Sequence, residues 1–255
     1  MDTTLEFYEH LASDYHLVYA DWRRSVERQG ETLDRLIRAA LGPPPRSVLD
    51  CTCGIGTQAI GLAARGYRVH ATDLSPAAVE RARREAASFG VSLTFGVADL
   101  RTLEAQVAGT FDVVLACDNS LAHLVRDADL RLAARNMWAK VQTGGLLLAS
   151  MRDYDQLVQE QPRATAPLVC VTPEGRRIVF MVWDWANDLR TYVGHLFIVR
   201  EAAGVWQTAH HATTFRAYQR SEIDVTLREA GFADLRWHTP EESGYYQPVV
   251  TARRR

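Results

Sequence analysis

The sequence predicts an α/β protein in which helices cover both faces of a doubly wound, mostly parallel sheet, with an antiparallel β segment inserted late in the chain. Between residues 46 and 152, short apolar stretches alternate with helical stretches, which is the pattern of consecutive βαβ units. After Arg152, three long β-rich stretches are separated only by turn-like breaks, which is typical of an antiparallel meander. With 255 residues, the chain has room for one domain and this insertion.

The chain before the α/β unit is expected to be helical. Residues 3–22 carry aromatic side chains at helical spacing, so they contain at least one amphipathic helix. A second helix is predicted from Val26 to Leu41, and the stretch GPPPR ends it because proline cannot continue a helix. The aromatic residues of the first segment are Phe7, Tyr8, Tyr15, Tyr19 and Trp22.

The α/β unit itself is predicted to alternate strands and helices. Its strands are the stretches SVLDC, YRVHATD, SLTFGVAD, FDVVLACD and LLLASM. The helix in TQAIGLAAR ends at Gly66, and the next helix has Ser75 as its N-cap, Pro76 at its first position and Gly90 at its end. A further helix is expected near Asp127–Val141.

The last hundred residues are predicted to hold the meander and then to return to the α/β unit. The meander strands are RRIVFMVWDW, RTYVGHLFIVRE and VWQTAHHATTFRAY, while Cys170 is expected in a loop. The stretch SEIDVTLREAGF is a capped helix that ends at Gly231, and LRWHTP and YQPVVTAR are the closing strands.

Composition favours a cytoplasmic enzyme or binding domain. The net charge of −2 gives no basis for binding nucleic acid or a membrane, and the three terminal arginines are typical of a solvated tail. The first ten residues contain acids and no apolar core, so no secretory signal is expected. No apolar run approaches the ~20 residues of a membrane span. The four cysteines have no regular spacing, which favours free thiols in a reducing compartment.

A glycine-rich loop follows the first predicted strand. Gly54, Gly56 and Ala59 form a G-x-G-x-x-A pattern between a strand and a helix, and Asp73 ends the next strand. Backbone without side chains lets a nucleotide approach the helix N-terminus, and the acid can accept from both ribose hydroxyls. The alternative is a tight turn with no ligand. The neighbouring Cys-x-Cys is neither a redox motif nor a zinc motif, so no metal is expected.

Two further acids indicate which nucleotide cofactor the loop would bind. Asp50 closes the first strand immediately before the glycines, where a carboxylate would be poorly placed beside a pyrophosphate but suits an amine-bearing methionine moiety. Asp99 ends the third strand, where an acid can accept from an adenine amino group. These acids favour S-adenosylmethionine over NAD.

Taken together, residues 46–152 resemble the class I S-adenosylmethionine-dependent methyltransferases, a Rossmann-like group. More narrowly, the stretches NSLAHL (119–124) and GGLLLASMRDYD (144–155) resemble the glycine and sarcosine N-methyltransferases. The resemblance implies a seven-stranded doubly wound sheet with a reversed last strand. It also implies an N-terminal helical cap (1–45), a cofactor-binding core (46–154 and 216–255) and an antiparallel β lid over the substrate (155–215).

The resemblance implies a set of residues around S-adenosylmethionine. Gly54 and Gly56 would flank its methionine part, Asp73 would bind ribose, and Arg28 would meet its carboxylate, although Arg28 could equally be a solvated helix residue. The aromatic residues of the first segment could close over the sulfonium or pack as core. The implied cofactor-binding residues are Tyr15, Trp22, Arg28, Asp50, Cys51, Gly54, Gly56, Asp73, Leu74, Asp99, Leu100, Cys117 and His123.

The same resemblance implies a catalytic set of Asn119, Arg152, His123 and Tyr15. Arg152 could clamp an acceptor carboxylate or pair with Asp153 or Asp155. Asn119 could orient the acceptor or cap the next helix, and His123 could reach a ligand or pack in a helix. Both Asn119 and Arg152 follow strands at their carboxyl ends, where open α/β sheets bind ligands.

The predicted function is methylation of a small amine-bearing metabolite, with glycine or sarcosine as the first choice. The lid is rich in aromatic residues such as Trp183 and Trp185, which could form its core or wall a pocket larger than glycine needs. A methyltransferase for a larger acceptor, with transfer to nitrogen, oxygen or carbon, is therefore the alternative. An NAD-dependent oxidoreductase and a non-catalytic sensor are less favoured by the sequence, and a homo-oligomer remains open.

Overall fold

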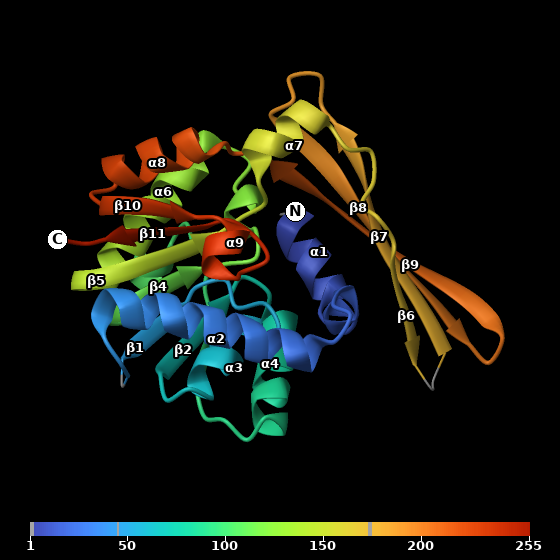
Figure 1. Cartoon of the computed structure of the whole chain (residues 1–255), viewed down its shortest axis with the longest axis horizontal. Coiled ribbons are helices and arrows are strands. Elements are labelled where there is room, and N and C mark those ends of the chain that lie inside the picture. The colour runs from blue at the N-terminus through green and yellow to red at the C-terminus, as the bar shows by residue number, and fades with distance from the viewer. Residues whose placement is uncertain (1–2, 45, 173–174) are drawn as a thin grey trace.

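The computed structural model describes residues 3–44, 46–172 and 175–255, which form two β-sheets and the helices around them (Figure 1). Residues 1, 2 and 45 of the predicted N-terminal cap lie outside the described residues. The larger sheet has seven strands in the order β10-β11-β5-β4-β1-β2-β3. Strands β1 to β5 pair in parallel, whereas β11 is antiparallel to both of its neighbours. The predicted fold class is confirmed, including the reversed last strand.

The strands of the larger sheet are short, and most of them coincide with the predicted apolar stretches. They are β1 (Ser47–Asp50), β2 (Arg68–Asp73), β3 (Thr94–Val97), β4 (Phe111–Ala116), β5 (Val141–Ser150), β10 (Ala233–His238) and β11 (Val249–Arg253). The helices are α1 (Thr3–Leu11), α2 (Trp22–Leu41), α3 (Thr57–Ala63), α4 (Pro76–Ser88), α5 (Leu103–Gln106), α6 (Asp127–Lys140), α7 (Tyr154–Glu160), α8 (Arg220–Glu229) and α9 (Pro240–Ser243). Two short 3-10 turns, η1 (Tyr15–Val18) and η2 (Ser120–His123), lie between these elements.

The core lies on both faces of the larger sheet. Helices α2 and α3 cover one face, and α6 and α8 cover the other (Figure 1). Successive side chains of a strand point to opposite faces. Leu49 therefore belongs to the same buried cluster as Met137 of α6, whereas its neighbour Val48 belongs to the cluster that contains Leu33 of α2. Burial on both sides explains why the central strands are continuous apolar runs without alternation.

The second sheet consists of the late β-rich segment, in the order β6-β7-β8-β9, with every pair antiparallel. Its strands are β6 (Leu168–Thr172), β7 (Gly175–Trp185), β8 (Thr191–Ala202) and β9 (Val205–Arg216). It stands beside the larger sheet, and α1 lies between the two (Figure 1). The inner face carries buried residues, among them Val179, Met181 and Leu196, and these join the core cluster of the larger sheet.

The structure differs from the predicted elements at several places. Helix α2 begins at Trp22 rather than Val26, because the Asp21 side chain accepts a hydrogen bond from the Arg24 amide (3.0 Å) and caps the helix there. Cys170 lies in strand β6 and not in a loop. The strand's sequence LVCVT is apolar, but it is a short edge strand in which Val169 and Val171 are exposed. The short helices α5, α7 and α9 were not predicted. Among the described residues, no helix combines the length and apolarity needed to cross a membrane.

Candidate active site

Two cavities adjoin at the carboxyl ends of the parallel strands. The smaller cavity, of about 290 Å³, is lined by the loops that follow β1 to β4. The larger cavity, of about 690 Å³, lies between the α/β unit, helices α1 and α2, and the inner face of the second sheet. Both are lined by Tyr8, Tyr15, Asp118 and His123. A ligand in one cavity can therefore lie against a ligand in the other.

The glycine-rich loop shapes the floor of the smaller cavity. Gly54 has φ +51° and lines this cavity, and a Cβ at this position would lie 3.3 Å from Tyr15 Cε1. Gly56 has φ +95° and does not line the cavity, but its Cβ would lie 2.9 Å from Ile60 Cδ1. Gly54 thus keeps space open toward the ligand side, whereas Gly56 permits close packing at the start of α3.

Asp73 anchors this loop to the end of β2. Its Oδ2 accepts a hydrogen bond from the Gly54 amide (2.8 Å), and its Oδ1 accepts one from the Ser75 amide (3.0 Å). Burial raises the pKa of the carboxyl above its ordinary value, although the backbone amides oppose the shift. Because the carboxylate also lines the smaller cavity, it has capacity left for a ligand hydroxyl. This donor and acceptor set fits the ribose of an adenosyl cofactor.

Asp50, the other acid of the loop, lies deeper than predicted. It is fully buried and lines neither cavity, and its Oδ2 has no hydrogen-bond partner among the described residues. Burial, reinforced by the negative charge of Asp73, raises the pKa of Asp50 to about 8. The protonated acid is thus the stable form in the folded chain at neutral pH. The contact of Asp50 with the methionine amine stays a prediction, and the structure places the side chain behind the loop and not at a cavity wall.

Replacing Asp50 with asparagine is expected to stabilise the protein increasingly as pH rises. Below pH ~4 the carboxyl is protonated in both states, and between pH ~4 and 8 only the unfolded chain releases the proton. The wild type therefore loses up to about 1.4 kcal/mol of unfolding free energy per pH unit, whereas Asp50→Asn does not. Urea denaturation at pH 5 and pH 8 measures this difference. If the unfolding free energies of the two proteins changed equally with pH, the raised pKa of Asp50 would be contradicted.

The N-terminal aromatic residues meet His123 at the junction of the cavities. The Tyr8 hydroxyl and His123 Nε2 are 2.8 Å apart in a hydrogen bond, and the Tyr8 and Tyr15 rings contact edge to face at 6.0 Å. His123 also packs on Phe215, with ring centroids 4.5 Å apart. Burial raises the pKa of Tyr8 well above its ordinary value, so its hydroxyl stays neutral. His123 is thus both packed and in reach of a ligand.

Arg152 lines the larger cavity, among aromatic residues of the second sheet. Its Nη1 donates to the Tyr192 hydroxyl (2.6 Å), and its guanidinium carbon lies 5.0 Å from the centre of the Trp183 ring. Asp153 and Asp155, its possible partners, pair with Arg220 instead. No carboxylate oxygen of a described residue lies within 4.0 Å of the Arg152 guanidinium. This cation is therefore available to an anionic group of a ligand.

Asn119 is held beside Arg152 in a left-handed backbone conformation, with φ +67°. Its Oδ1 accepts a hydrogen bond from the Arg152 amide (3.2 Å), and its side chain does not cap the turn that follows. Its Nδ2 is buried without a hydrogen-bond partner among the described residues. A buried donor without a partner costs about 1–3 kcal/mol, and an acceptor group in the larger cavity, which Asn119 lines, would match this amide.

Sequence reasoning missed Asp118, which lines both cavities. Its carboxylate accepts hydrogen bonds from the hydroxyls of Tyr19 (3.0 Å), Tyr245 (2.7 Å) and Tyr246 (2.6 Å). The signal was present, because Asp118 follows the same strand as Asn119 at its carboxyl end. The tyrosines come from opposite ends of the chain, and no local pattern in the sequence could reveal this convergence.

Most of the predicted cofactor residues gather at the smaller cavity. Those lining it are Tyr15, Cys51, Gly54, Asp73, Leu74, Asp99, Leu100, Cys117 and His123. Arg28 lines the larger cavity instead, and Trp22 lines neither, since its Nε1 donates to Thr57 Oγ1 (3.0 Å) in the core. The additional residues of the smaller cavity are Thr4, Tyr8, Thr52, Ala98, Arg101, Asp118, Ser120, Leu124, Val125, Arg126 and Asp129.

The lid tryptophans and the acid expected at adenine can also be placed in the structure. Trp183 and Trp185 stack around Tyr192 in the core of the second sheet and do not line either cavity. Asp99 binds the Arg101 side chain through both of its oxygens, so the acid that was expected at adenine is already paired. Within the part of the chain that the structure describes, no three His, Cys, Asp or Glu side chains are grouped as metal ligands.

Comparisons with known proteins agree with this architecture. Residues 48–145 match the family described as a methyltransferase domain. The chain is 34% identical over 139 residues to a glycine/sarcosine N-methyltransferase of Parasynechococcus marenigrum, covering 54% of this chain and 48% of that protein. It is 33% identical over 162 residues to the glycine N-methyltransferase of Oryctolagus cuniculus, covering 58% and 51%. The chain thus spans about half the length of these curated relatives.

Solved structures extend the likeness to nearly the whole chain. DesVI of Streptomyces venezuelae superposes with a TM-score of 0.79 at 15% identity, covering 96% of this chain and 98% of that one. An S-adenosylmethionine-bound amino pentose methyltransferase of Micromonospora echinaspora superposes with a TM-score of 0.73 at 19% identity, covering 90% and 92%. At such identities the likeness shows the fold. The chain therefore contains a segment that matches a methyltransferase domain, has the fold of solved methyltransferases, and resembles the glycine and sarcosine N-methyltransferases over about half of their length.

Proposed function

We propose that this protein transfers a methyl group from S-adenosylmethionine to the amine of a small molecule that carries a carboxylate. The matched methyltransferase domain and the N-methyltransferase relatives support the reaction class. The adenosine part of the cofactor would be held in the smaller cavity by Asp73, Leu74 and Leu100, next to the Gly54 backbone. When bound, the cofactor supplies an electrophilic methyl group.

The observation that carries the proposal is the position of Arg152. A guanidinium with no acidic partner among the described residues lies in the larger cavity, beside the buried amide donor of Asn119. A carboxylate matches both donors, since guanidinium groups bind carboxylates through paired hydrogen bonds. The rings of Trp183 and Phe215 lie 5.0 Å and 5.4 Å from the guanidinium carbon, and such apolar surroundings strengthen this attraction. The amine of such an acceptor would then be directed toward the smaller cavity.

The chain's own contribution to the reaction is mainly alignment. Tyr8, Tyr15 and His123 line both cavities, so they enclose the place where the two substrates would meet. Holding reactants at attack distance and excluding water can supply much of the lowering of the barrier. Hydroxyl and imidazole groups at this place would also stabilise the positive charge that develops on the amine.

The acceptor with the strongest support from the relatives is glycine or sarcosine. The cavity favours a second candidate, because about 690 Å³ is in the range of roughly 300–1,000 Å³ that holds drug-sized ligands. Apolar side chains of the second sheet, such as Leu168, Val179 and Leu196, line that volume. A larger carboxylate-bearing amine with an apolar body is therefore the alternative acceptor.

The proposed function is tested by measuring release of S-adenosylhomocysteine across a panel of amines. The panel contains glycine, sarcosine, larger α-amino acids, and matched amines that lack the carboxylate. Turnover confined to the carboxylate-bearing members is expected, and the size of the best substrate decides between the two candidates. Turnover of the matched amines at equal kcat/KM would contradict the proposed acceptor class.

A further inference from the structure

Asp118 is an acid without a cationic partner at the junction of the two cavities. No Lys, Arg or His nitrogen of the described residues lies within 4.0 Å of its carboxylate, which is held by the three tyrosine hydroxyls. Two of these residues, Tyr19 and Tyr246, line the larger cavity and not the smaller one. The backbone of Asp118 has φ +56°, a conformation that is uncommon outside glycine and that often marks functional positions. The side chain is thus held by three neutral hydroxyl donors, and no cation of the described residues pairs with it.

Gln29 of α2 places an amide donor near this acid. Its Oε1 accepts from Gln58 Nε2 (2.7 Å), which fixes the orientation of the amide and directs Nε2 away from that bond. Gln29 is 2% exposed and lines the larger cavity, and its Nε2 has no partner among the described residues. The Tyr245 hydroxyl lies 2.7 Å from both Gln29 Oε1 and Asp118 Oδ1, so a single hydroxyl links the two side chains.

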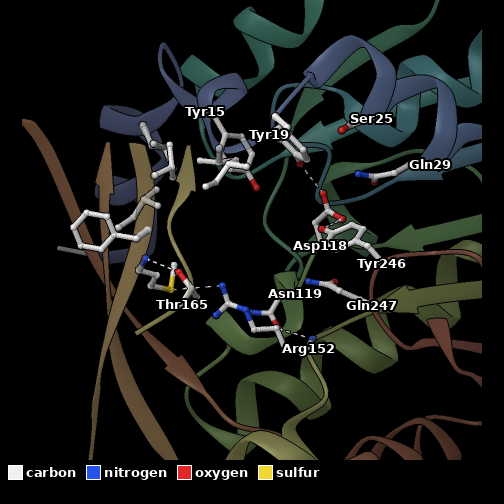
Figure 2. A pocket seen from close by; sticks show the side chains of 18 of the residues that line it. Tyr15, Tyr19, Ser25, Gln29, Asp118, Asn119, Arg152, Thr165, Tyr246 and Gln247 are labelled. Carbon is white, nitrogen blue, oxygen red and sulfur yellow. Dashed lines mark hydrogen bonds between the residues drawn. The ribbon is translucent and has the colours of Figure 1, made fainter. Parts of the chain in front are cut away.

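The close view shows how these groups are arranged. In Figure 2, Asp118 lies between Tyr19 and Tyr246, and the amide end of Gln29 points into the cavity on the same side. Arg152 and Asn119 lie at another part of the wall. The cavity therefore presents two separate polar regions, one with a cation and an amide, and one with an anion and an amide.

We propose that Asp118 and Gln29 bind the charged α-amino acid end of S-adenosylmethionine, with the ammonium at Asp118 and the carboxylate at the Gln29 amide. The inference rests on the proposed function. An ammonium matches an acid that lacks a cation, and a carboxylate matches a buried donor that lacks an acceptor. Arg28, which precedes Gln29 and also lines the larger cavity, adds positive charge on the carboxylate side. Asp118 lines both cavities, so it can meet this end while the adenosine part lies in the smaller one.

Calorimetry with two nucleosides tests the assignment without any turnover. S-adenosylhomocysteine carries the α-amino acid end, and 5′-methylthioadenosine lacks it. The wild type is expected to bind S-adenosylhomocysteine more tightly than 5′-methylthioadenosine. Asp118→Asn is expected to lower the affinity for S-adenosylhomocysteine by about 10- to 100-fold, the usual effect of losing a charged hydrogen bond. Affinity for 5′-methylthioadenosine should change less than threefold.

Two further variants separate charge recognition from structure. Gln29→Glu keeps the oxygen that accepts from Gln58 and Tyr245 but places a negative charge where the donor was. This variant should bind S-adenosylhomocysteine more weakly than the wild type does, and its affinity for 5′-methylthioadenosine should be unchanged. Tyr246→Phe removes one hydroxyl from Asp118 and leaves its charge, so it should reduce affinity by less than Asp118→Asn does.

The outcomes are distinct. If Asp118→Asn lowered the affinity for both nucleosides equally, the residue would only support the loop. If the affinity for both were unchanged, the amino acid end would bind elsewhere. Either result overturns the inference and leaves the proposed function intact. A wild-type protein that binds neither nucleoside would overturn the proposed function as well. Circular dichroism and the thermal midpoint verify that each variant is folded.

Discussion

Replacing Gly54 with valine is expected to abolish measurable binding of S-adenosylhomocysteine. Gly54 has φ +51°, which a β-branched residue does not readily adopt. A Cβ there would also lie 3.3 Å from Tyr15 Cε1, and the larger valine would push into the cavity that both residues line. The Gly54 amide bonds Asp73, so the change would also displace the acid expected to bind ribose. Calorimetry should show a loss of affinity of more than about 100-fold.

Gly66→Val is the matched control for this substitution. Gly66 has φ +88°, so valine meets a similar backbone penalty, but a Cβ there has nothing within 4 Å and the residue lines neither cavity. The control should lower the thermal midpoint and retain affinity for S-adenosylhomocysteine. If Gly54→Val bound the ligand as tightly as Gly66→Val does, the glycine-rich loop would not be the cofactor loop.

Replacing Arg152 with lysine is expected to raise KM for carboxylate-bearing acceptors by about 10- to 100-fold, with a smaller change in kcat. Lysine keeps the charge but cannot form the paired hydrogen bonds of a guanidinium with a carboxylate. It also loses the planar contact with the Trp183 and Phe215 rings that orients the group. Steady-state kinetics with an accepted amino acid and the matched amine without its carboxylate measure the effect. KM for the matched amine should not change.

Arg220→Lys provides the control for Arg152. Arg220 pairs with Asp153 and Asp155 and lines neither cavity, so the same substitution there should leave both KM values unchanged. An Arg152→Lys protein with wild-type KM for carboxylate-bearing acceptors would contradict the role given to Arg152. A general rise in KM for every amine would instead point to damage of the second sheet.

Much of the fold could be predicted because the local signals were strong. The apolar run VVLA in β4 and the Ser75-Pro76 start of α4 each reflect a local physical preference, and both elements form as expected. Strand β6 was missed although its sequence LVCVT is apolar, because the run is short and has a proline on either side in the sequence, a pattern that also suits a loop. Helix α2 begins early because of a capping contact from Asp21.

Site residues that lie next to a recognisable strand could be predicted from the sequence, whereas those brought together from distant parts of the chain could not. Gly54 and Asp73 stand at fixed positions after their own strands, so the sequence located them directly at the smaller cavity. Asp118 depends on tyrosines at positions 19, 245 and 246, which the fold alone brings together. Asp50 was expected at the ligand, but its depth in the sheet could be seen only once the strands were packed.

The central claim is that the glycine-rich loop binds an S-adenosyl ligand. Titration calorimetry with S-adenosylmethionine and with NAD tests it most directly, because the two cofactors make different demands on the same kind of loop. We expect one molecule of S-adenosylmethionine to bind per chain, with no heat of binding from NAD. Binding of NAD alone would contradict the claim.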